Sequence, residues 1–127
     1  MAYQYHEKKS RKVGTGGMRR SMRDKKRSQS GGHFIATKIG SANVVQKRMR
    51  GGSSKTSLKT AEYANIVMSD GKVKKSKIIR VIESPSNREY TRMNIITKGA
   101  VIETESGKAR VTSRPGQHGI INAILLK

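Results

Sequence analysis

"YANIVMSDGKVKKSKIIRVIE", residues 63–83, predicts two β-strands joined by a tight turn. Apolar and β-branched residues fill 63–68 and return after residue 72, and Asp70 and Gly71 lie between the two runs. An Asp-Gly pair between two such runs is a strong hairpin signal, because glycine adopts a positive φ at little cost. We therefore expect an antiparallel hairpin here.

The same pattern returns in "AVIETE" (100–105) and "KARVTS" (108–113), around Ser106 and Gly107. Side chains alternate between the two faces of a strand, which puts Val101, Glu103 and Glu105 on one face and Ile102 and Thr104 on the other. This predicts a second hairpin.

Further strands are predicted in "NVVQKRMR" (43–50), "KTSLKT" (55–60) and the nearly all-apolar "IINAILL" (120–126). Pro85 is expected in the turn "ESPSNRE". Residues 87–99 fit a short helix or an irregular turn ending at Gly99 as well as a strand. The fold class predicted for 37–127 is all-β, a small barrel-like or sandwich core of short antiparallel strands with a long basic N-terminal extension.

The composition favours a polyanionic partner. The 127 residues hold 28 Lys and Arg against 8 Asp and Glu, and only 33% are hydrophobic, below the roughly 45–50% of an average globular chain. Residues 1–60 carry 16 basic residues against 2 acidic ones, and 61–127 carry 12 against 6. Such a charge is typical of nucleic-acid-binding proteins.

A membrane partner is not expected, because there is no lipidation signal, no amphipathic basic helix and no apolar run near the roughly 20 residues of a membrane-spanning helix. The polar start predicts no secretory signal, and the absence of cysteine is compatible with a reducing compartment. A cytoplasmic location is the default.

Residues 1–36 are predicted to be a basic arm. No period of 3.6 or 2 survives between Lys8 and Gly32, so this stretch cannot bury enough apolar surface to offset its chain entropy. We expect it to be disordered without RNA and to order on binding, although a solvated tail is the plainer interpretation. The predicted RNA contacts in the arm are Lys8, Lys9, Arg11, Lys12, Arg19, Arg20, Arg23, Lys25, Lys26 and Arg27.

"QKRMRGGSSKTSLKT", residues 46–60, resembles a nucleotide-binding loop only superficially. Ser54 stands where that loop needs a glycine, and "QKRMR" is too charged for the buried strand that should precede it. Paired glycines between basic residues instead let a phosphate backbone come close, though an ordinary solvated hairpin tip is the alternative. The predicted RNA contacts in this stretch are Lys47, Arg48, Arg50, Gly51, Gly52 and Lys55, and Lys38 before it is also predicted to contact RNA.

"SRPGQHG", residues 113–119, predicts a type II turn at Pro115-Gly116 that projects Arg114, Gln117 and His118 together. These side chains suit RNA backbone and unpaired bases. A purely structural turn between two core strands is the alternative.

No catalytic or metal-binding arrangement is predicted. His6, His33 and His118 have no cysteine partners, no metal-ligand spacing and no nearby carboxylate pair. We expect no enzymatic activity, no cofactor, no metal and no small-molecule substrate.

"GTGGMRR" (14–20), "TKIG" (37–40), "RMRGGSSKTSLK" (48–59) and "NIITKGAVIETESGKARVTSRPGQHGIINAILL" (94–126) resemble, in this order, small-subunit ribosomal protein eight of the archaeal and eukaryotic type. This family is distinct from the bacterial-type protein that shares the number. The chain resembles the short archaeal form, because the insertion that eukaryotic relatives carry in the C-terminal half is absent.

The resemblance implies a non-enzymatic component of the ribosome in the cytoplasm, with a β-rich core and a basic extension. It implies small-subunit ribosomal RNA and neighbouring small-subunit ribosomal proteins as partners. The family's R-x-R-G-G element falls on 48–52 and its S-R-P-G-Q element on 113–117. A ribosome-assembly factor and a DNA-compacting chromatin protein remain as alternatives.

Overall fold

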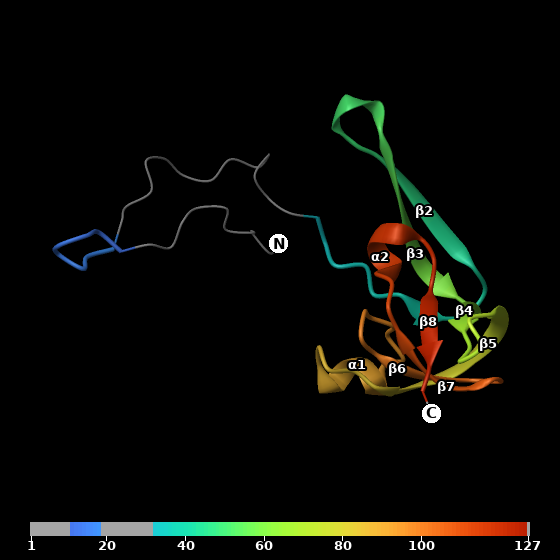
Figure 1. Ribbon diagram of the computed structural model, residues 1–127. Helices are drawn as coiled ribbons and strands as arrows, with labels where there is room; N and C mark the ends of the chain where they lie inside the picture. Colours follow the sequence, from blue (N-terminus) through green and yellow to red (C-terminus); the bar gives the residue numbers. More distant parts are fainter. Residues whose placement is uncertain (1–10, 19–31, 127) are drawn as a thin grey trace. The chain divides into compact units, whose positions relative to one another are not determined.

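The computed structural model describes residues 11–18 and 32–126, and the chain divides into two compact units, Met1–Phe34 and Ile35–Lys127. In the first unit the backbone turns back on itself: the Lys12 amide donates to the Gly17 carbonyl at 3.0 Å. All helices and strands of the described residues lie in the second unit (Figure 1).

A closed barrel of five strands forms the centre of the second unit. Its strands are β4 (Tyr63–Val67), β5 (Val73–Glu83), β6 (Val101–Thr104), β7 (Gly107–Val111) and β8 (Asn122–Leu125), paired in that order. The all-β fold is therefore confirmed, and of the two expected forms it is the barrel. The four sequential pairs are antiparallel, but β4 and β8 close the barrel in parallel. Five strands that alternate in direction must end with the first and last parallel, so the barrel is antiparallel except at this seam.

Both predicted hairpins are confirmed. β4 pairs with β5 from Tyr63↔Lys77 to Val67↔Val73, and Gly71 in the turn has a φ of +75°. β6 pairs with β7 down to Thr104, whose Oγ1 donates to the Gly107 carbonyl.

The ambiguous residues 87–99 contain a short helix, α1 (Arg88–Arg92), and then an irregular stretch to Gly99. The helix begins at Asn87, whose side-chain oxygen accepts a hydrogen bond from the Glu89 amide at 3.0 Å. Pro85 lies in the preceding turn, as predicted.

A second sheet of three strands adjoins the barrel in the order β1-β3-β2, formed by β1 (Lys38–Ile39), β2 (Asn43–Arg48) and β3 (Ser54–Ala61). The antiparallel β2–β3 pair is a hairpin that extends away from the barrel (Figure 1). A single 3-10 turn, Arg50–Gly52, forms its tip. Lys38 pairs with Thr60 at the base of this sheet, at the end of β3 opposite the tip.

The hydrophobic core fills the barrel and continues under the base of the hairpin. Ile102 and Thr104 are buried while Val101 and Glu103 are half-buried, as the alternation predicts. Leu58 brings β3 into the same core. The other buried members are Ala61, Ala64, Ile66, Ile78, Val81, Ile96, Ala100, Ala109, Val111, Ile121 and Ala123. No helix in the described part of the chain is long and apolar enough to cross a membrane.

Candidate nucleic-acid interface

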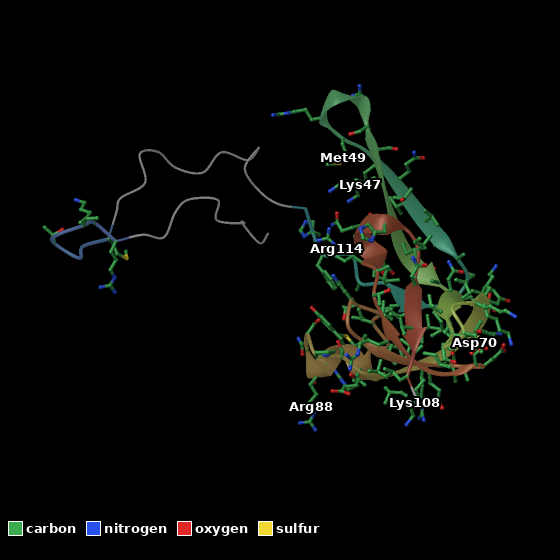
Figure 2. All side chains as sticks on the ribbon, viewed as in Figure 1. Lys47, Met49, Asp70, Arg88, Lys108 and Arg114 are labelled. Carbon is green, nitrogen blue, oxygen red and sulfur yellow. The ribbon has the colours of Figure 1, made fainter. Side chains whose placement is uncertain are left out.

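The tip of the β2–β3 hairpin concentrates positive charge. Lys47 and Lys55 are direct cross-strand partners, so both side chains lie on the same face of the hairpin, and both are exposed. Like charges directly opposite one another destabilise a strand pair unless an anion or solvent compensates them. Arg48 follows on the other face, and Arg50 lies in the tip. Lys47 projects from the hairpin just below this tip (Figure 2).

Backbone groups are accessible at this tip. Gly51 and Gly52 have φ values of +81° and +85°, which an L side chain adopts only with strain. A Cβ at either position would have no other atom within 4 Å, so nothing covers the backbone there. The Met49 amide closes the turn by donating to the Ser53 carbonyl at 2.6 Å.

The cations of the hairpin have no acidic neighbour in the sequence. No Asp or Glu occurs between Asp24 and Glu62. Within 11–18 and 32–126 the ion pairs are Lys77–Glu62, Arg80–Glu103 and Arg92–Glu89, all on the barrel or α1. The hairpin therefore presents charge that no described carboxylate neutralises.

The one-turn helix α2 (Pro115–His118) packs against β3 and joins this basic tip to the second predicted motif. The Lys55 Nζ donates to the Gln117 Oε1 at 3.2 Å, and the Thr56 Oγ1 donates to the His118 carbonyl at 3.3 Å. The Ser57 Oγ donates to the Gly116 carbonyl at 2.8 Å. Three consecutive strand residues point to alternate faces, yet all three reach α2, so α2 lies along the edge of β3 that β2 leaves open.

The predicted type II turn at Pro115-Gly116 is wrong. Pro115 is buried and begins a helical turn, a position for which its fixed φ is well suited, and the left-handed residue is Gly119 with a φ of +73°. The Arg114 amide donates to the His118 Nδ1 at 3.3 Å, which holds the imidazole against its own helix. The alternative of a structural connection is also met, because α2 links β7 to β8.

Gly119 is a contact residue that the sequence did not single out. A Cβ at this position would lie 2.7 Å from Thr56 Oγ1 and 2.8 Å from Thr56 Cβ, so only glycine allows α2 to come this close to β3. Nor did the sequence alone predict that the hydroxyls of Thr56 and Ser57 bind α2. The run "SSKTS" at 53–57 was the one sequence signal for such hydroxyl contacts.

The structure thus brings together predicted contacts from two stretches, 46–60 and 113–119. We call the resulting set the hairpin surface, formed by Lys47, Arg48, Arg50, Gly51, Gly52, Lys55, Arg114 and Gln117. Lys38 lies at the base of the sheet and His118 is held by α2, so neither lies at the tip.

The predicted contacts in the arm belong to the other unit. Arg11 and Lys12 are exposed there. The remaining predicted arm contacts lie outside the described residues: Lys8, Lys9, Arg19, Arg20, Arg23, Lys25, Lys26 and Arg27.

The chemistry available at the hairpin surface is anion binding. Arginine guanidinium and lysine ammonium groups bind phosphate oxygens, and the open space around Gly51 and Gly52 lets such a ligand come close to the backbone. Among the described residues, no group of three or more His, Asp or Glu side chains is placed to hold a metal ion. The surface is therefore suited to a polymer of phosphates.

Comparison with known proteins gives one consistent family. The family model described as "Ribosomal protein S8e" matches residues 5–126. The small ribosomal subunit protein eS8 of Sulfolobus acidocaldarius is 50% identical, over 100% of this chain and 99% of that protein. The proteins of the same name from Nanoarchaeum equitans and Sulfurisphaera tokodaii are 41% and 50% identical, over 100% and 89% of this chain and 100% and 90% of their own lengths.

Proposed function

The chain belongs to the ribosomal protein S8e family, and we propose that it binds and positions small-subunit ribosomal RNA through the hairpin surface. The role of this family is structural rather than catalytic. The proposed RNA binding by this chain rests on the charge and geometry of the hairpin.

The observation that carries the proposal is the Lys47–Lys55 pair with Arg48 and Arg50 beside it. Four cations lie within one hairpin tip, two of them directly opposite one another, without a carboxylate from any described residue. A phosphate oxygen placed between the ammonium groups of Lys47 and Lys55 would relieve this repulsion. The positive φ of Gly51 and Gly52 leaves the backbone open to the same ligand.

The proposed mechanism is neutralisation of phosphates by a preorganised surface. The Lys55 Nζ donates to the Gln117 Oε1 of α2, and Arg114, the N-cap of α2, lies beside this helix (Figure 2). Because Lys55 is already hydrogen-bonded before binding, this side chain loses less entropy when RNA docks. The released counterions make such binding strongly dependent on salt.

The basic arm, residues 1–36, is proposed to add affinity without being needed for folding. Thr37, in the second unit, is buried, and its Oγ1 donates to the Leu58 carbonyl at 2.8 Å, which ties the segment before β1 to the core. Deletion of 1–36, which keeps Thr37, should therefore leave the thermal melt of the core unchanged and weaken RNA binding. A core that melts earlier after this deletion contradicts the arm hypothesis.

The proposed binding mode is tested with two variants that remove equal charge. The hairpin variant carries Lys47→Gln, Arg48→Gln, Arg50→Gln and Lys55→Gln. The control variant carries Lys72→Gln, Arg88→Gln, Lys98→Gln and Lys108→Gln, all exposed positions with no ion pair in the described structure. Affinity for a small-subunit ribosomal RNA fragment is measured at several salt concentrations.

Each phosphate contact contributes about 0.7–0.9 to the slope of log affinity against log salt, so four lost contacts lower the slope by about 3 units. We expect this drop for the hairpin variant and a much smaller one for the control. Equal slopes in the two variants would mean that net charge alone drives binding and would remove the hairpin surface from the mechanism.

The further parts of the proposal follow from the same assignment. Neighbouring small-subunit ribosomal proteins are its proposed protein partners, and the ribosome in the cytoplasm is its proposed location. Assembly of the large subunit and compaction of DNA are the competing roles, and the identity of the bound nucleic acid separates them.

A further inference from the structure

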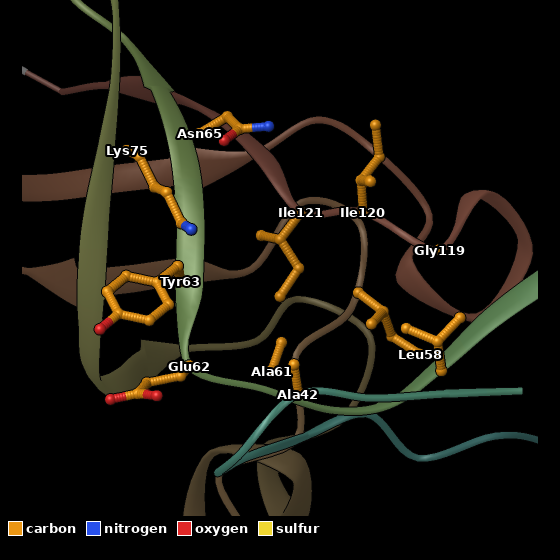
Figure 3. Close-up of a pocket in the computed structure, with 11 residues that line it drawn as sticks. Ala42, Leu58, Ala61, Glu62, Tyr63, Asn65, Lys75, Gly119, Ile120 and Ile121 are labelled. Atoms are coloured by element: carbon orange, nitrogen blue, oxygen red, sulfur yellow. The ribbon is translucent and has the colours of Figure 1, made fainter.

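A hollow of about 240 Å³ lies between the base of the hairpin and the outside of the barrel. Leu58 of the hairpin and Ile120 line one side, while Tyr63 and Lys75 of the barrel line the other (Figure 3). Val44 of the hairpin also lines the hollow. This combination of apolar walls, one exposed aromatic ring and one ammonium group is not used by the phosphate-binding tip.

The hollow continues one face of the hairpin. Val44, Gln46 and Arg48 alternate along β2 and therefore share a face. Val44 is 53% exposed and lines the hollow, and Arg48 lies at the far end of the same row. A strand of RNA whose phosphates bind Arg48 is thus directed toward the hollow.

Tyr63 is the stacking surface within it. Its side chain is 45% exposed, and the Lys75 Nζ lies 4.6 Å from the ring centroid. A nucleobase that stacks on this ring takes the place of the ammonium group. Because lysine has a flexible four-carbon stem, the displaced Lys75 ammonium group would be free to bind the phosphate of the same nucleotide.

A pair of amides lies at the margin of the hollow. The Asn65 Nδ2 donates to the Asn122 Oδ1 at 3.2 Å, across the parallel β4–β8 seam. Asn65 lines the hollow, and both residues line a neighbouring depression over β8. This pairing leaves the Asn65 Oδ1 as an acceptor and the Asn122 Nδ2 as a donor, the two functions that the edge of an unpaired base requires.

The acidic group at the hollow is neutralised. The carboxylate of Glu62 also lines it, and Lys77 Nζ lies 3.2 Å from the Glu62 Oε1. The hydrogen bond and the attraction to Glu62 raise the pKa of Lys77 above its usual 10.5, so Lys77 remains charged. The carboxylate therefore presents little repulsion to an approaching nucleotide.

We propose that this hollow receives an unpaired nucleobase, stacked on Tyr63, from the RNA strand that follows the Arg48 face of the hairpin. The inference rests on the RNA binding proposed above, but it adds base contact at a separate place. The barrel would then bind unpaired nucleotides in addition to supporting the hairpin.

A protein segment is the competing occupant, because Val67, Val73 and Ile124 form an apolar row across β5, β4 and β8 on the adjoining part of the barrel. The charges favour RNA: Lys75 lines the hollow, Arg48 leads to it, and its one carboxylate is already paired. A basic, aromatic and amide-lined hollow complements a nucleotide better than an apolar peptide.

The test compares Tyr63→Leu, which removes the ring and keeps apolar bulk, with Tyr63→Phe, which keeps the ring. Full-length variants are titrated with oligoadenylate, oligouridylate and oligocytidylate, and with a fully base-paired RNA duplex, at one fixed salt concentration. We expect Tyr63→Leu to bind at least one of the single strands about fivefold more weakly or worse, with Tyr63→Phe and duplex binding unchanged.

Unchanged binding of all single strands by Tyr63→Leu would overturn the inference and leave the hollow to a protein segment. An equal loss for single strands and duplex would also overturn it. If Tyr63→Leu does not fold, photo-crosslinking of the unaltered protein to RNA containing 4-thiouridine replaces it. Crosslinks at Tyr63, Asn65, Lys75 or residues 119–121 support the inference, and crosslinks only elsewhere refute it.

The hairpin variant separates this inference from the proposed function. Loss of salt-dependent affinity in the hairpin variant, together with equal binding by Tyr63→Leu and Tyr63→Phe, would leave the proposed function standing and the base site refuted. The reverse pattern would refute the hairpin surface and the route past Arg48, and would support base binding at Tyr63.

Discussion

Gly119→Ala tests whether the hairpin and α2 form one rigid surface. Gly119 has a φ of +73°, and its added Cβ would lie 2.7 Å and 2.8 Å from the Oγ1 and Cβ of Thr56. The left-handed conformation costs a residue with a Cβ about 1–2 kcal/mol. Forcing an extra methyl group into a packed contact costs about 1–3 kcal/mol more, which gives about 2–5 kcal/mol in total.

Gly71→Ala is the matched control, because Gly71 has nearly the same φ, +75°, and no atom within 4 Å of its Cβ position. The free energy of unfolding of Gly71→Ala should fall only by the cost of the left-handed conformation, about 1–2 kcal/mol. The two variants are compared by thermal and urea unfolding. A difference of about 1 kcal/mol or more corresponds to a melting temperature lower by at least about 4 °C for Gly119→Ala.

Thr56→Gly removes both atoms that the new methyl group meets. In this background the penalty of Gly119→Ala should therefore fall toward that of Gly71→Ala. Equal melting of Gly119→Ala and Gly71→Ala, or no coupling between positions 119 and 56, would refute the close packing of α2 on β3 as a stabilising contact.

Gly51→Asn with Gly52→Asn adds side chains at the tip while keeping residues that tolerate a positive φ, so RNA affinity should fall without a change in melting. Gly71→Asn makes the same change on the barrel and should bind RNA normally; equal affinities of the two would contradict close backbone approach at the tip. Thr37→Val leaves the buried Leu58 carbonyl without its side-chain donor and should lower the free energy of unfolding by about 1–3 kcal/mol, whereas Thr112→Val, at an exposed position, should cost much less. Equal losses in urea unfolding would contradict this assignment for Thr37.

The sequence predicted local structure well. Asp70-Gly71 and Ser106-Gly107 specify their turns through neighbouring residues, and both hairpins form where these pairs lie. The basic hairpin was also predicted, because its two strands and its paired glycines are close in the sequence. Each of these three hairpins depends only on two strands that are adjacent in the sequence and on the turn between them.

The sequence did not predict the features that depend on distant residues. The hydrogen bond from Lys55 to Gln117 joins residues 62 positions apart, and the Thr56–Gly119 contact is as distant, so no local pattern indicates either. The type II turn at Pro115 failed for a related reason. Both a type II turn and a helix accept proline at that point, and packing against β3 selects the helix.

The ambiguity at 87–99 was settled by the Asn87 cap, which gives the Glu89 amide a partner and starts a helix that the mixed side chains alone did not specify.

Ultraviolet crosslinking in cells, followed by sequencing of the attached nucleic acid and mapping of the crosslinked peptides, tests the central claim most directly. The proposed function predicts that small-subunit ribosomal RNA is the main partner and that crosslinked peptides include residues 47–55 of the hairpin. A majority of large-subunit precursor RNA would indicate an assembly factor, and a majority of DNA would indicate a chromatin protein. Either majority, or small-subunit RNA crosslinked without any contact at the hairpin, would contradict the account.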